Sequence, residues 1–92
     1  MIEVTYEGGP DPLRFTVVVR EGSGETRHAV TLRAADFSRL GKGAAPERVI
    51  EAAFAFLLER EPKESMLSRF DLTVIARYFP EFERELPRYL AR

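Results

Sequence analysis

Hydrophobic and polar residues alternate along the first third of the chain, and this pattern predicts three β-strands. The alternation has a period of two over residues 2–7, 13–20 and 27–33, as expected for strands with one buried face. Glycine- and proline-rich stretches at 8–12 and 22–25 separate the three segments and have the residues of turns. We therefore expect an antiparallel β-β-β arrangement.

The apolar pattern also predicts how the second and third strands pair. A four-residue loop at 22–25 places Val19 opposite His28 and Val17 opposite Val30, so that the apolar side chains share one face. A shift of one residue would mix the two faces. In this register, the other face carries two pairs of arginines: Arg14 with Arg33 and Arg20 with Arg27.

Residues 46–80 are too apolar for an ordinary surface helix. Pro46 suits the first turn of a helix, and the residues from 49 to 58 are nearly all apolar. A helix with so narrow a polar stripe must pack on more than one side. We expect Phe54 and Leu57 to be central core residues.

Further start and stop signals divide the rest of the chain. Asp36 can cap a short turn through Leu40, and Asp71 can cap a later segment. Pro62 ends the apolar helix and can start another, whose apolar stripe includes Met66, Leu67 and Phe70. Pro80 opens the last helix, and Pro87 interrupts it. The prediction is one α+β domain over residues 1–92: a three-stranded antiparallel sheet followed by three or four helices packed on one face.

Composition narrows the classes of function. The formal net charge is −1, and the two halves of the chain are each close to neutral, so neither is a strongly basic block. There is no cysteine, which excludes disulfides and thiolate metal sites. The N-terminus lacks the pattern of a signal peptide, and the longest apolar run, 52–58, is far shorter than a membrane span. We expect a cytoplasmic protein with no membrane partner.

Candidate catalytic chemistry is sparse. His28 is the only histidine, and on the apolar face of its strand a structural role is the more frequent one for such a residue. No second histidine is present to complete a metal site, and no histidine lies near Ser65, Ser68 or Thr73 to activate a hydroxyl nucleophile. We expect no enzyme activity, no metal and no cofactor.

Two surfaces are candidates for binding. The first is the arginine face, on which Arg14, Arg20, Arg27 and Arg33 could contact phosphates; the alternative is a solvated sheet face on which Glu3 and Glu7 cancel part of the charge. The second is an aromatic cluster that either belongs to the core or extends into a partner surface. Its members are Tyr78, Phe79, Phe82 and Tyr89.

The C-terminal half carries a short series of motifs: a phenylalanine–leucine run at 54–58, EREP at 59–62, FDL at 70–72 and RYFPE at 77–81. In this pattern the chain resembles a group of short bacterial proteins that carry no assigned function. The resemblance covers roughly a third to a half of the chain and implies no enzyme, cofactor or partner.

The resulting prediction is a non-catalytic module that binds another protein or self-associates, most simply as a two-fold homodimer. The mismatch between many apolar side chains and one small sheet motivates this prediction, because leftover apolar surface tends to mark an interface. The alternative is a weak nucleic-acid-associated protein that uses the arginine face of the hairpin.

Overall fold

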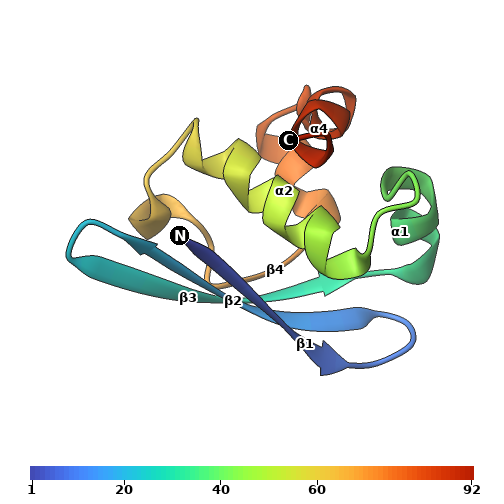
Figure 1. Ribbon diagram of the computed structural model, residues 1–92, viewed down its shortest axis with the longest axis horizontal. Coiled ribbons are helices and arrows are strands. Elements are labelled where there is room, and N and C mark those ends of the chain that lie inside the picture. The colour runs from blue at the N-terminus through green and yellow to red at the C-terminus, as the bar shows by residue number, and fades with distance from the viewer.

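A computed structural model describes all residues, 1–92, and shows a four-stranded sheet with the helices on one of its faces (Figure 1). The strands are β1 (Ile2–Gly8), β2 (Leu13–Glu21), β3 (Gly24–Leu32) and β4 (Arg69–Asp71), in the order β1-β2-β3-β4. The helices are α1 (Ala34–Leu40), α2 (Pro46–Leu58), α3 (Ile75–Tyr78) and α4 (Phe82–Leu90), and two 3₁₀ turns, η1 (Lys63–Ser65) and η2 (Leu72–Val74), flank β4. The predicted α+β class is confirmed.

The sheet has one strand more than predicted, and it is mixed rather than purely antiparallel. β4 pairs with β3 in parallel, with Phe70 opposite Val30. The sequence pattern predicts that Met66, Leu67 and Phe70 form one stripe of a helix that starts at Pro62. Instead, η1 is a single 3₁₀ turn and the chain then extends into β4. Three residues with one buried side chain are too few to show the alternation of a strand in sequence.

The predicted register of β2 and β3 is wrong by two residues, although the faces are right. Val19 pairs with Thr26 and Arg20 pairs with Glu25, which leaves Gly22 and Ser23 as a two-residue loop. Gly22 has φ = +63°, and a type II′ hairpin turn places glycine at this first central position. A shift of two keeps every side chain on its predicted face, so the apolar pattern alone cannot distinguish the two registers.

The helix α2 lies between the sheet and α4, so that it is buried on two sides (Figure 1). Phe54 and Phe56 are two residues apart, close to opposite sides of a helix with 3.6 residues per turn, and neither is exposed. Phe54 packs against Phe70 and His28, whereas the ring of Phe56 lies 5.1 Å from that of Phe82 on α4. The expectation that this helix packs on more than one side is confirmed.

The expected core position of Phe54 and Leu57 is also confirmed, since their exposed fractions are 0% and 4%. These residues belong to one hydrophobic core that also includes residues of β2, β3, β4 and α4.

Polar residues at the start of α2 and directly after its end hold α4 in place. Arg48 donates to the carbonyl oxygen of Tyr89 at 2.7 Å, near the C-terminal end of α4, where carbonyls lack helical partners. The Tyr89 hydroxyl donates to Glu59 at 2.6 Å, and the guanidinium of Arg60 lies 3.6 Å from the centre of the Phe56 ring. Polar contacts therefore surround the aromatic contact between the two helices.

Some predicted helix boundaries need correction. The helix α1 begins at Ala34, before Asp36, and its first amide donates to Asp11 of the β1–β2 loop at 3.0 Å. The last helix, α4, begins two residues after Pro80 and continues through Pro87 to Leu90. Asp71 does cap η2 as expected, since its side chain accepts from the amide of Thr73. No helix is long and apolar enough to cross a membrane.

Truncation of Phe56 tests the two-sided packing of α2. Because Phe56 is fully buried among aromatic rings of the α4 side, Phe56→Ala should lower the free energy of unfolding by about 3–5 kcal/mol. The exposed Glu51 on the same helix provides a control, and Glu51→Ala, which removes only an exposed ion pair with Arg48, should change it by no more than about 1 kcal/mol. Urea unfolding followed by circular dichroism measures both. Equal effects of the two substitutions would contradict this packing.

Candidate functional site

An apolar pocket of about 180 Å³ lies at the C-terminal end of α2. Its walls come from the end of α2 and the turn after it, from η1 and the loop after it, from β4, and from η2 and α3 with the following Phe79. Eight of its ten lining residues are hydrophobic, and they include Leu57, Met66, Phe70 and Ile75. Ligand sites for drug-sized molecules usually occupy about 300–1,000 Å³, so this pocket suits one side chain better than a cofactor.

Two large apolar side chains at this pocket face solvent. Leu67 is 47% exposed and Tyr78 is 67% exposed, and both line the pocket. The other large hydrophobic residues with comparable exposure, Met1 and Tyr6, are in or next to β1. Exposed apolar surface is thus concentrated at the pocket and along the strand at the sheet edge.

His28 fixes the loop that carries Leu67. It is only 2% exposed, and its Nδ1–H donates to the carbonyl oxygen of Leu67 at 2.7 Å. Since a carbonyl can only accept, Nδ1 carries a proton, and Nε2 shares a hydrogen bond of 2.9 Å with the Thr26 hydroxyl. The amide of Ala29 donates to Ser68 at 2.8 Å and adds a second attachment. The pocket rim is therefore tied to the sheet.

Glu61 is the only charged residue that lines the pocket. Its carboxylate makes no hydrogen bond or ion pair, and partial burial raises its pKa above the usual value. In the chain from residue 48 onward, only three charged side chains make no such contact. They are Glu61, which lines the pocket, Arg77, which precedes the pocket residue Tyr78 in the chain, and Arg69, which lies on the uncovered face of the sheet.

The structure separates the four aromatic residues of the predicted cluster. Phe82 and Tyr89 are 0% and 4% exposed, and both rings pack against Phe56 in the core. Tyr78 and Phe79 line the pocket, and Tyr78 is the only exposed one of the four. Of the four, only Tyr78 and Phe79 are therefore placed to contact a partner, because Phe82 and Tyr89 are buried in the core.

The four predicted arginines do not form one cationic ladder. Arg20 makes ion pairs with Glu3 at 2.9 Å and with Glu25 at 3.0 Å. Arg33 lies outside β3, immediately before α1, and pairs with Asp36 at 2.9 Å. Arg14 and Arg27 remain exposed on the uncovered face of the sheet without an ion pair. The prediction that Glu3 offsets charge on this face agrees with the Glu3–Arg20 contact.

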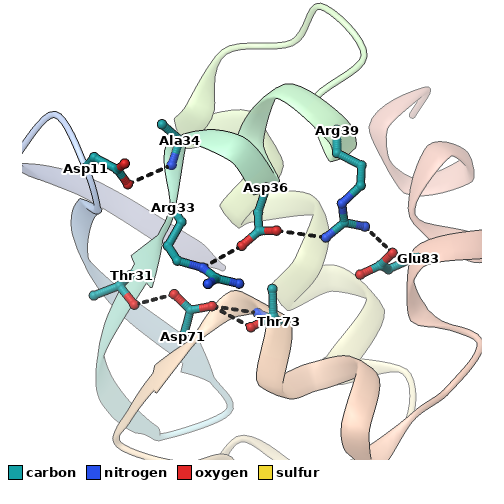
Figure 2. A network of polar contacts seen from close by, with 9 residues as sticks. All are labelled: Asp11, Thr31, Arg33, Ala34, Asp36, Arg39, Asp71, Thr73 and Glu83. Atoms are coloured by element: carbon teal, nitrogen blue, oxygen red, sulfur yellow. Dashed lines mark hydrogen bonds and ion pairs between the residues drawn. The ribbon is translucent and has the colours of Figure 1, made fainter.

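A polar network at the start of α1 connects the sheet to the helices (Figure 2). The carboxylate of Asp36, 7% exposed, bridges Arg33 and Arg39, and Arg39 also pairs with Glu83 of α4. No group of three or more His, Asp or Glu side chains is arranged to hold a metal ion. The network is thus a set of satisfied ion pairs between elements.

Asp71 is the second carboxylate in Figure 2, and its surroundings favour the ionised form. Burial alone would raise the pKa of Asp71, but hydrogen bonds from Thr73 and Thr31 and the nearby charge of Arg33 lower the pKa below its usual value. The Thr31 hydroxyl donates at 2.7 Å, and the Thr73 hydroxyl donates at 2.6 Å. Asp71 thereby joins β3 to η2, which leads directly into the α3 wall of the pocket.

Comparison with protein-family models, with curated proteins and with solved structures finds no match for this chain. The resemblance of its C-terminal motifs to a group of short bacterial proteins stays a prediction. In the structure, EREP lies in the turn after α2, and RYFPE covers the end of α3 and the turn before α4. Three residues of these two motifs, Glu61, Tyr78 and Phe79, line the pocket.

Sequence reasoning singled out Tyr78 and Phe79 but did not identify Leu67 or Glu61 as surface residues of interest. Leu67 had the spacing of a buried helical stripe, and only the extended backbone after η1 places it at the surface. Glu61 stands between Arg60 and Pro62 in a charged turn, where nothing in the sequence distinguishes it from a solvated glutamate. No sequence signal identified this carboxylate.

Asp71→Asn tests the electrostatic role of this carboxylate. A lowered pKa means that the folded state favours ionised Asp71. The contribution of Asp71 to the free energy of unfolding is therefore complete above the unfolded pKa of about 3.9, and it is lost as the pH falls through the lower pKa of the folded state. The substitution should lower the free energy of unfolding by about 1–3 kcal/mol at pH 7, and by less near pH 2. Urea unfolding at both pH values measures the difference. Glu7→Gln, at an exposed and unpaired carboxylate, is the control, and an effect of Asp71→Asn that is equal at both pH values would contradict this role.

Proposed function

We propose that this chain is a non-catalytic protein-interaction module whose contact surface is centred on the pocket between α2, β4 and α3. The observation that carries the proposal is the exposure of Leu67 and Tyr78 beside a pocket of side-chain size. Exposed apolar side chains that gather at one place on the surface, and aromatic residues among them, are features of interaction sites.

The surroundings of the pocket favour a protein partner. Aromatic residues such as Tyr78 are enriched at protein interfaces, and the rim loop is held by His28 and Ala29, so little of its freedom is lost on binding. Hydrogen bonds within the fold occupy both ring nitrogens of His28, so the only histidine is engaged in structure rather than poised as a base. A cytoplasmic location belongs to the same proposal and accords with a chain that has no cysteine.

Site-specific photocross-linking tests the contact surface. A benzophenone amino acid at position 78 should form covalent adducts with a protein in the source cell, because this side chain is exposed at the pocket. The same group at Tyr6, which is 46% exposed on β1, is the matched control and should give few adducts. Leu67→Asp should reduce the adducts formed from position 78. Equal yields from both positions, or no protein adduct at 78, would remove the support for this surface.

The alternative function is weak nucleic-acid binding through the uncovered sheet face. It is favoured by Arg14, Arg27 and Arg69, whose guanidinium groups are exposed there without an ion pair. It is disfavoured by the pairing of Arg20 with two glutamates and by the absence of aromatic side chains between the arginines.

Charge reversal separates this alternative from the first proposal. If phosphates bind this face, Arg14→Glu combined with Arg27→Glu should abolish the binding of a labelled oligonucleotide, and wild-type binding should weaken steeply with salt. Fluorescence anisotropy at low and moderate salt measures both effects. Arg84→Glu combined with Arg88→Glu, at exposed positions on α4, is the matched control. Binding that survives the first double substitution would exclude this face as the site.

A further inference from the structure

The pocket surface carries both halves of a complementary contact. One half is a cavity with an unpaired carboxylate, Glu61, in its wall. The other half is Tyr78, which also lines the rim of that cavity but is 67% exposed, and which follows the exposed and unpaired Arg77 on the short helix α3. An aromatic side chain could enter the cavity, and an adjacent cation could meet the carboxylate.

A contact between two identical copies requires a surface that is complementary to itself. In a two-fold dimer, each residue i that contacts residue j of the partner is matched by a residue j that contacts residue i. The pocket surface meets this condition because the exposed Tyr78 stands at the rim of an apolar cavity, a free carboxylate lies in the cavity wall, and a free arginine directly precedes Tyr78 in the chain. Most other charged side chains from residue 48 onward already have partners within the chain.

We propose that this surface is the interface of a two-fold homodimer, in which Tyr78 of each copy enters the partner's pocket and Arg77 pairs with the partner's Glu61. This inference rests on the proposed function and names its partner as a second copy of the chain. A partly buried carboxylate without a counter-charge is costly, and an arginine from the second copy would offset that cost.

Another unpartnered surface is the outer edge of β1, and it is less suited to self-association. Pairing two copies of β1 over their full length, centred on Thr5, would place Glu3 opposite the partner's Glu7. Like charges directly opposite one another destabilise an antiparallel pair. The pocket surface, by contrast, places unlike charges together.

The interface is small, because it centres on two exposed apolar side chains and one pocket. Interfaces of the smallest class are weak and transient, so we expect dissociation constants between about 10 µM and 1 mM. The mass in solution should therefore rise with concentration from that of one 10.5 kDa chain towards twice this value.

A charge-swap experiment tests the specific pairing. Glu61→Arg alone would place two cations together at each contact, and Arg77→Glu alone would place two anions together, so each variant should remain monomeric. An equimolar mixture of the two variants restores an unlike pair at both contacts and should dimerise like the wild type. Static light scattering across this concentration range measures the masses, and circular dichroism checks that each variant is folded. Glu47→Arg, at an exposed and unpaired carboxylate on the first turn of α2, is the control and should dimerise normally.

Two outcomes would overturn the inference: a wild-type chain that stays near 10.5 kDa at every concentration, or a dimer that either single charge reversal leaves intact. These outcomes remain distinct from failure of the proposed function. If the wild type is monomeric but the benzophenone at position 78 captures a different protein, the surface is an interaction site and the partner is not a second copy. If neither dimer nor adduct forms, both the inference and the proposed function are contradicted.

Discussion

The burial of α2 on two sides is the constraint on which the rest of the structure depends. A chain of 92 residues has little apolar surface to spare, and here one helix serves as the common core element for both the sheet and α4. Phe54 directs its contacts to the sheet side and Phe56 to the α4 side. Because both sides of α2 are occupied along its middle, the surface at its C-terminal end, where the chain turns away, is the part left incompletely covered.

Much of this arrangement could be predicted from the sequence, because the signals are local. Alternation defines three strands, and the near absence of polar residues from 49 to 58 requires a central helix. Information that depends on distant parts of the chain could not be obtained in this way. The short strand β4 exists because Phe70 fits against Val30, forty residues earlier, and three residues are too few to carry a period. The two candidate hairpin registers bury the same side chains and differ only in turn length.

The candidate sites, too, depend on contacts between distant parts of the chain that the sequence pattern does not reveal. The predicted arginine ladder depended on the hairpin register, and a shift of two residues places Glu25 opposite Arg20 in place of Arg27. The pocket combines residues from Leu57 to Phe79 that meet only when β4 returns to the sheet. Tyr78 was recognisable as part of an aromatic cluster, but only the fold separates it from Phe82 and Tyr89, which lie in the core.

The parallel pairing of β4 also has a consequence for the order of folding. The strands β1, β2 and β3 are joined by short connections and can pair as soon as they have been synthesised, whereas β4 reaches β3 only after α1 and α2 have crossed the sheet. Until then the outer edge of β3 presents unpaired backbone groups beside apolar side chains such as Val30. Such an edge is open to pairing with other chains. The last strand, short as it is, therefore covers this edge of β3 at Ala29, Val30 and Thr31, and makes a strand of only three residues the final edge of the sheet.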